Sequence, residues 1–411
     1  MDKSILLVYA PVMIILLYCL PCCTTGSGTD SINYPNLFVE LLDKSPAEVE
    51  ARIQKDFNQL FYGDDETERV YYPAGEDMAY IEDILHKDVR SEGMSYGMMI
   101  AVQLDKKEEF DRLWKWSKTY MQHKKGQRKH FFAWNAATDG TIRDPNSASD
   151  GEEWIVMALF FASARWGDGE GIFNYQAEAQ AILDAMLNKV ESSDNDTTVT
   201  NMFNKTEKQV VFVPVGNADD FTDPSYHVPH FYELWARRAD KNADFWKEAA
   251  SVSRMFLKKA AHPETGLTPD YANFDGTPTD FFNGGHDDFR FDAFRTAMNI
   301  AVDYIWFGRD EWAVEQNNRL LNFFTSEGLD EYVNQYTLDG KRLSSDRSAG
   351  LEAMNAAACL ASTVDNRKDF VQVLWDMPVP TGRYRYYDGL LGMLAMLQLS
   401  GNFQIYEPVN Q

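Results

Sequence analysis

The fold of this chain is decided by a helix–turn–helix stretch at residues 291–325, FDAFRTAMNIAVDYIWFGRDEWAVEQNNRLLNFFT. This stretch predicts helices over roughly 291–307 and 310–325, separated by the polar turn Gly308-Arg309-Asp310. A turn this short places two consecutive helices antiparallel and side by side. The stretch is therefore one helical hairpin, and further hairpins of this kind are expected along the chain without a clear sequence repeat.

Helices are predicted on both sides of this hairpin. Ser45-Pro46-Ala47-Glu48 is a capping box with proline at the first helical position, and Gly63 is a natural stop. About twelve helices in successive hairpins predict a single all-α toroid. The remaining helices are expected at roughly 93–104, 106–122, 152–166, 174–190, 229–239, 242–261, 350–363, 366–376 and 386–400.

One region near residues 197–213 has a different pattern. Thr197-Thr198-Val199-Thr200 and Gln209-Val210-Val211-Phe212-Val213 flank the polar segment Asn204-Lys205-Thr206-Glu207-Lys208. β-branched residues around a polar loop favour two paired strands. We therefore expect a small β-hairpin inserted between helices.

The charge balance excludes several classes of function. The 411 residues include 39 Lys and Arg against 63 Asp and Glu, a formal net charge of −24. A phosphate-binding surface must be basic, so this balance argues against a nucleic-acid partner and against docking to anionic lipid by charge. No glycine-rich phosphate loop, HExxH motif or GxSxG elbow is present.

The N-terminus is typical of an export signal. Ile5–Leu20 is an almost unbroken apolar run after a short head with Lys3, and it is shorter than the ~20 residues of a spanning helix. We interpret residues 1–23 as a signal peptide, 24–34 as a flexible linker and 35–411 as one domain. The chain is then expected in the periplasm, at the outer membrane or outside the cell.

The cysteines refine this interpretation. Leu20 lies three residues before Cys23, the spacing of a bacterial lipoprotein signal, which predicts a membrane tether through a lipidated Cys23. A plain secretory peptide and a retained single-span anchor are the alternatives. Only Cys359 lies in the body, among small residues, so we expect no internal disulfide and an inert, buried thiol.

The first of three notable acids is Glu92, in the segment Ser91–Met99 at the start of a predicted helix. Its neighbours are apolar, aromatic or glycine. A partly buried carboxyl among such residues can keep its proton near neutral pH, as a general acid must. The alternative is a glutamate that only complements the helix dipole.

Two further acids lie at other helix starts. Asp150 heads the helix that contains Trp154, where a simple N-cap is the alternative. Asp292 lies one turn before Arg295, which can hold it ionised, and a surface ion pair is the alternative. His286 is expected to be a hydrogen-bonding loop residue, because no second histidine lies at ligand spacing. In a toroid of inner and outer helices, three such starts can line one end of the hole.

These segments resemble the signature of glycoside hydrolase family 8. Ser91–Met98 resembles its general-acid motif, Ser149–Leu159 its second acidic motif and Phe289–Arg295 its base motif, in the family's order. The match extends from about Tyr71 to the last helix. Glu152 stands where the family has an aspartate and keeps the same charge. The resemblance implies an (α/α)6 barrel of six helical hairpins and hydrolysis with inversion at the anomeric carbon.

The resemblance also implies a role for each acid. Glu92 protonates the glycosidic oxygen, and Asp292 deprotonates the water that attacks from the opposite face. Asp150 binds and distorts the sugar at the cleavage point. An inverting pair must leave room for that water, so its carboxyls are expected ~6.5–9.5 Å apart. No metal or organic cofactor is implied.

Two segments indicate the substrate. Asp292–Tyr304 and Trp154–Ser163 resemble the xylan-active branch of the family, and look most like its reducing-end xylose-releasing exo-oligoxylanases. This implies release of xylose from the reducing end of β-1,4-xylo-oligosaccharides. We also expect a monomer. Those enzymes close the leaving-group end with a histidine-bearing loop, whereas Ser344–Gly350 has no histidine. Either His286 or Arg347 closes the cleft instead, or it is open, as in an endo-β-1,4-xylanase or another β-1,4-glucanase.

Aromatic residues are candidate sugar platforms, because an aromatic face can cover the apolar C–H face of a pyranose. We expect this role for Trp134, Tyr226 and Tyr386, with core packing as the alternative. Arg295 and His286 complete the predicted substrate-binding set.

Two hypotheses come from other classes of protein. A non-catalytic glycan-binding lipoprotein would share the export signal and the aromatic residues, but it would not need Glu92 and Asp292 together. A polysaccharide lyase on a similar toroid would need a constellation of Tyr, His or Arg side chains. Sugar release by the pure protein separates the first from a hydrolase, and an ultraviolet-absorbing unsaturated product identifies the second.

Overall fold

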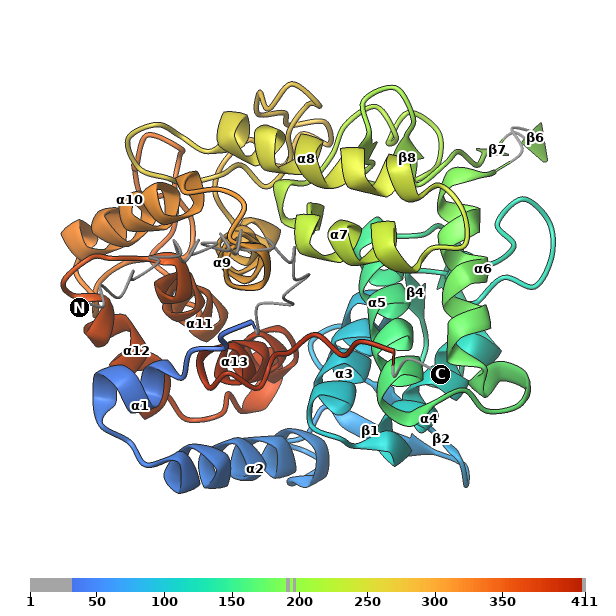
Figure 1. Ribbon diagram of the computed structural model, residues 1–411, viewed down its shortest axis with the longest axis horizontal. Coiled ribbons are helices and arrows are strands. Elements are labelled where there is room, and N and C mark those ends of the chain that lie inside the picture. The colour runs from blue at the N-terminus through green and yellow to red at the C-terminus, as the bar shows by residue number, and fades with distance from the viewer. Residues whose placement is uncertain (1–31, 190–192, 195–196, 409–411) are drawn as a thin grey trace, which may run out of the picture. The chain divides into compact units, whose positions relative to one another are not determined.

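The described part of the chain is built around a ring of helices (Figure 1). The computed structural model describes residues 32–189, 193–194 and 197–408, and one compact unit begins at Asn33. Within these residues, the inner ring consists of α3 (Ser91–Gln103), α5 (Ser149–Trp166), α7 (Pro229–Arg238), α9 (Phe294–Phe307), α11 (Ala349–Ala358) and α13 (Arg385–Leu399).

Five of the inner helices are each followed along the chain by an outer helix that packs against them. In this way α4 contacts α3, α6 contacts α5, α8 contacts α7, α10 contacts α9 and α12 contacts α11. The ring closes because α13 contacts both α2 and α3. The expected (α/α)6 barrel is confirmed. The outer helices are α2 (Pro46–Tyr62), α4 (Lys107–Trp116), α6 (Tyr175–Leu187), α8 (Ala243–Ala260), α10 (Trp312–Glu327) and α12 (Arg367–Asp376).

Most helix bounds agree with the sequence prediction to within a few residues, and the capping box at Ser45 is present. The predicted helix 106–122 changes character, because α4 ends at Trp116 and a π-helical segment, Ser117–Met121, follows. The predicted helix 350–363 ends as the 3₁₀ turn Cys359–Ala361. The short helix α1 (Leu37–Leu42) was not predicted, since six residues are too few to show a helical period.

The β-structure is confined to short strands between the helices. In the predicted hairpin region, β8 (Phe203–Asn204) pairs with β9 (Gln209–Val210) around the expected polar loop. The prediction was wrong for Thr197-Thr198, which forms β7 and pairs with β6 (Ser193–Asp194). Unpredicted are the hairpin of β1 (Tyr71–Ala74) with β2 (Met78–Ile81), and a sheet of β3 (Val89–Arg90), β4 (Asn135–Ala136) and β5 (Ile142–Asp144).

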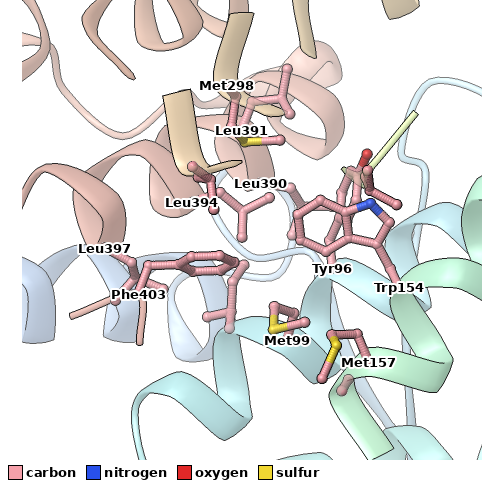
Figure 2. Close-up of a cluster of buried hydrophobic side chains, with 14 of the residues drawn as sticks. Tyr96, Met99, Trp154, Met157, Met298, Leu390, Leu391, Leu394, Leu397 and Phe403 are labelled. Carbon is pink, nitrogen blue, oxygen red and sulfur yellow. The ribbon is translucent and has the colours of Figure 1, made fainter. Parts of the chain in front are cut away.

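Large apolar side chains fill the interior of the ring. Figure 2 shows Met99 from α3, Met157 from α5 and Leu394 from α13 in one cluster. The ring of Tyr96 packs edge-on against Trp154, with centroids 4.9 Å apart. The centre of the ring is therefore a packed apolar core.

Three remaining expectations concern the N-terminus and the cysteine. The predicted signal at residues 1–23 and the linker up to residue 31 lie outside the described residues. Within the part that the structure describes, no helix has both the length and the apolar character needed to cross a membrane. Cys359 is a free thiol that is fully buried, as expected, and burial raises the pKa of this thiol.

Candidate active site

Three acidic side chains converge on one buried arginine at the starts of inner helices. Arg295 lies in the first turn of α9, and its side chain is 1% exposed. Its Nη1 lies 2.9 Å from Oε2 of Glu92 and 2.9 Å from Oδ2 of Asp150, while Nη2 lies 2.9 Å from Oδ1 of Asp292. The three helix starts that the sequence singled out therefore meet at one guanidinium.

Neutral polar groups complete the surroundings of Arg295. Nη1 also donates to the hydroxyl of Tyr96 at 2.6 Å, and Nη2 donates to Oγ of Ser225 at 3.0 Å. A buried guanidinium needs such pairing, because an unpaired charge in the interior is costly. The sequence associated Arg295 only with Asp292, since Glu92 and Asp150 are distant along the chain.

Packing between α3 and α13 positions Glu92. Gly93 leaves space for Tyr386, because a Cβ at this position would lie 2.4 Å from Cε2 of the tyrosine. The hydroxyl of Tyr386 donates to Oε1 of Glu92 at 2.8 Å. The backbone N–H of Ser91 donates to the carbonyl oxygen of Trp134 at 3.0 Å, which fixes the helix start. Glu92 is therefore held by side chains from α9 and α13, so complementing the dipole of its own helix is not its main interaction.

The electrostatics of this cluster suit proton transfer. Burial raises the pKa of Glu92 to about 7, the charges of Asp150 and Asp292 add to this rise, and Arg295 opposes it. Burial also raises the pKa of Asp150. A carboxyl with a pKa near neutrality can both hold and release a proton, which is the property of a general acid.

Asp150 points inward from the start of α5. The N-cap position is Ala148, and no side chain caps this helix, so the alternative interpretation of Asp150 as an N-cap is wrong. Its Oδ1 accepts a hydrogen bond from the backbone N–H of Gly151 at 2.9 Å, and its Oδ2 accepts from Arg295. The carboxyl is thus fixed beside Glu92 and Asp292.

Asp292 lies in the 3₁₀ turn Phe291–Ala293 that precedes α9. Its side chain is 28% exposed and that of Glu92 is 16% exposed, so both acids reach solvent. Glu92 contacts Nη1 of Arg295 and Asp292 contacts Nη2. The two contacting carboxylate oxygens can therefore be no farther apart than two hydrogen-bond lengths plus the distance between these nitrogens. This is an upper limit on the separation, and it does not exceed the ~6.5–9.5 Å range of inverting pairs. The surface ion-pair alternative is wrong because Arg295 is buried.

Glu152 has a different role from the one its charge suggested. It is fully buried, and its Oε1 accepts a hydrogen bond from the backbone N–H of Phe132 at 2.8 Å. Burial raises the pKa of this carboxyl to about 8, which disfavours the negative charge expected from the family's aspartate. Its contact with Phe132 ties α5 to the segment before Trp134.

The predicted sugar contacts differ in their exposure. Trp134 is half-buried, with the guanidinium of Arg90 over its ring. The rings of Tyr226 and Tyr386 are each 4% exposed, which leaves little surface for a sugar face. His286 is partly exposed at the edge of the site, where its ring stacks on Tyr271.

Two buried acids next to Asp292 were missed by the sequence analysis, because neither lies in a recognisable motif. A carboxylate oxygen from each of Asp223, Asp270 and Asp292 lies within 4.8 Å of the other two. Among the described residues this is the one cluster with the spacing of metal ligands. Protein groups hold two of the three acids, because Arg295 binds Asp292, and His286 and two backbone N–H groups bind Asp270.

The fold and the site define a class of protein, the glycoside hydrolases. In a barrel of six helical hairpins, one carboxyl can protonate a leaving oxygen and another can accept a proton from water. Residues 83–401 match the glycosyl hydrolases family 8, and the chain belongs to this family. The resemblance recognised in the sequence is confirmed.

Relatives of known activity or structure cover nearly the whole chain. The chain is 46% identical to the reducing-end xylose-releasing exo-oligoxylanase Rex8A of Paenibacillus barcinonensis, over 93% of this chain and 99% of that protein. It is 44% identical to a reducing-end xylose-releasing exo-oligoxylanase of Halalkalibacterium halodurans, over 94% of this chain and 98% of the relative. The structure of a family 8 xylobiose complex from Teredinibacter turnerae matches with a TM-score of 0.88 at 47% identity, over 91% of this chain and 98% of the other.

Proposed function

We propose that this chain hydrolyses β-1,4-xylo-oligosaccharides with inversion and releases xylose from the reducing end. Glu92 is the general acid, Asp292 is the general base, and Asp150 binds and distorts the sugar at the cleavage point. The observation that carries this proposal is the guanidinium of Arg295, which holds all three carboxyls at one site. Hydrolysis with inversion needs one protonated and one ionised carboxyl.

The different surroundings of the two carboxyls support these roles. Glu92 has a pKa of about 7 and can deliver a proton to the glycosidic oxygen at neutral pH. Asp292 is paired with Nη2 of Arg295 and is more exposed, so it can meet a water on the opposite side of the sugar. Each proton transfer of this kind contributes ~10²–10⁴-fold to the rate.

The names of the relatives support xylo-oligosaccharides as the substrate. Two of the relatives are reducing-end xylose-releasing exo-oligoxylanases, and the Teredinibacter turnerae structure contains xylobiose. In this site, we propose Trp134 as the sugar platform, and Arg295, Tyr226 and Tyr386 as the groups that shape the substrate-binding surface, while His286 lies behind it in contact with Asp270.

A second mode of cleavage, endo-xylanase action, is favoured by the loop Ser344–Gly350. Arg347 in this loop is not free to close the cleft, because its Nη2 lies 2.5 Å from Oε1 of Glu352 and also donates to the carbonyl of Leu329. The Teredinibacter turnerae relative was also solved as a catalytic mutant in complex with xylohexaose and is named a xylanase. Reducing-end release requires another group to bind the free anomeric hydroxyl, since an unpaired buried hydroxyl costs ~1–3 kcal/mol.

Product analysis on a xylo-oligosaccharide ladder with a labelled reducing end tests the proposal. We expect labelled xylose as the first product, weak action on polymeric xylan, and poor hydrolysis of substrates reduced to an alditol. A spread of long products with equal cleavage of reduced substrates would establish the endo mode instead. Proton NMR of the earliest product tests inversion: the α-anomer is expected first, and a β-anomer would contradict the assigned mechanism.

We also propose that the chain is exported as a monomer and tethered to a membrane through a lipidated Cys23. The support is the apolar run Ile5–Leu20 and the spacing of Leu20 from Cys23. Cell fractionation of the full chain and of a Cys23→Ser variant tests the tether. We expect the full chain in the membrane fraction and the variant outside it. Light scattering of the released protein tests the monomer.

A further inference from the structure

The turn that carries Asp292 lacks a cap of its own. Neither the 3₁₀ turn Phe291–Ala293 nor the start of α9 has a side chain that caps it from the adjacent N-cap position. Phe291 has a φ of +43°, in the left-handed region that is unfavourable for a bulky residue. This backbone conformation therefore needs support from elsewhere in the fold.

Asp270 supplies this support from 22 residues upstream. Its Oδ1 accepts a hydrogen bond from the backbone N–H of Asp292 at 3.0 Å and another from that of Ala293 at 3.3 Å. The residue is 1% exposed, so water is poorly placed to replace these bonds. On the other side of the turn, the hydroxyl of Tyr387 in α13 donates to the carbonyl of Phe291 at 3.1 Å.

Asp270 is itself held by the loop that follows it. Nδ1 of His286 lies 2.6 Å from Oδ2 of Asp270, and the imidazole stacks on the ring of Tyr271 at 4.2 Å with an interplanar angle of 9°. The backbone N–H of Tyr271 donates to the carbonyl of His286, and that of Asp270 donates to the carbonyl of Asp288. Both oxygens of the Asp270 carboxyl are therefore fixed by named partners.

We propose that Asp270 is a positioning residue for the base, holding the first turn that carries Asp292, and that His286 orients Asp270 for this task. The inference rests on the proposed function, because it takes Asp292 to be the base. Asp270 acts through the backbone of Asp292 and touches neither the sugar nor the attacking water. Its loss should therefore lower kcat and leave KM nearly unchanged.

Three variants test this role. Asp270→Leu has a similar size and no acceptor oxygen, and a displaced base is expected to lower kcat by about 10²-fold, the cost of a misplacement near 1 Å. Asp270→Asn keeps an oxygen for the two N–H groups and should retain most of that kcat. His286→Phe keeps the stack on Tyr271 but loses the contact with Asp270, so its kcat should lie between the two. A histidine that bound the sugar would instead raise KM.

The control is Asp303→Asn, in the last third of α9. Asp303 is another buried acid, paired with Arg254 and away from the site. This variant is expected to lower the melting temperature and to keep kcat, so general destabilisation is separated from positioning. If Asp270→Leu does not fold, Asp270→Ser replaces it, because its short hydroxyl cannot reach both N–H groups.

The experiment separates failure of the inference from failure of the proposed function. If Asp292→Asn is inactive while Asp270→Leu folds and keeps the wild-type kcat, the positioning role of Asp270 is overturned and the proposed function stands. An active Asp292→Asn would remove Asp292 from the mechanism and the proposed function with it. A rise in KM without a fall in kcat in both Asp270 variants would also overturn the inference, since it would place Asp270 in substrate binding.

Discussion

Glu92 and Asp292 contact the same guanidinium, but the fold holds them in different ways. Glu92 lies in a regular helix, α3, whose remaining residues are all buried. Its carboxyl accepts a hydrogen bond from Tyr386. Asp292 lies in a 3₁₀ turn, is more exposed and depends on a loop through Asp270. The first acid is set by helix packing and the second by hydrogen bonds to the backbone.

This difference explains how one arginine can serve two opposite roles. Burial disfavours the ionised form of Glu92 more than Arg295 favours it, so the carboxyl keeps its proton near pH 7. Asp292 has solvent on one side and Nη2 of Arg295 on the other. The packing of each acid, rather than the arginine, therefore distinguishes the acid from the base.

The largest effect is expected from Glu92→Gln, which removes the proton donor and keeps the shape. Hydrolysis should fall by ~10²–10⁴-fold, because general acid catalysis is worth this much. Steady-state kinetics measure the fall, and calorimetry with a xylo-oligosaccharide should show nearly unchanged binding. Turnover close to wild type would mean that α3 does not supply the acid.

Arg295→Met tests the shared element of the comparison. Asp150 would remain buried, and Glu92 largely buried, without their cation, and breaking a fully buried pair costs ~3–5 kcal/mol. Urea unfolding should show a loss of this order at neutral pH and a smaller loss at low pH, where the carboxyls are protonated. The matched control is Arg254→Met, which removes another arginine, 11% exposed and paired with Glu233 and Asp303, and should spare the kcat of the folded protein.

The pH dependence of kcat/KM sharpens the comparison further. Glu92 must be protonated to act, and its pKa is about 7, so kcat/KM should fall tenfold per pH unit above that value. The hydrogen bond from Tyr386 lowers this pKa, since it favours the charged form. Tyr386→Phe should therefore move the basic limb to higher pH. An unmoved limb would show that another group titrates there.

The smallest effect is expected from Gly93→Ala, which disturbs only the packing behind the acid. The new Cβ would lie 2.4 Å from Cε2 of Tyr386, and overpacking of this kind costs ~1–3 kcal/mol. The melting temperature should fall, and kcat should fall less than in Glu92→Gln. Gly392→Ala is the control, because its nearest side-chain atom, Cε of Met377, is 3.9 Å away. Equal tolerance of both changes would mean that Tyr386 can move freely.

Features that depend on neighbouring residues were easier to predict than features that depend on distant contacts. Local patterns predicted the capping box at Ser45 and the helix order, because these depend on neighbouring residues. The two strands at Thr197-Thr198 and Gln209-Val210 were paired wrongly, since strand partners are not encoded by a local period. The buried state of Tyr226 could not be predicted either, because aromatic residues are common both in cores and in sugar sites.

By itself, the sequence determined the ring of helical hairpins, its family and the positions of Glu92, Asp150 and Asp292. Periodicity, turns and short motifs are local, so they can be recognised without knowledge of the tertiary contacts. Only the tertiary structure decided that Arg295 binds all three acids, and that Asp270 supports the turn of Asp292. The reason is that Arg295 and Glu92 are separated by 203 positions in the chain. Desolvation and hydrogen bonding at that contact arise only when the ring closes.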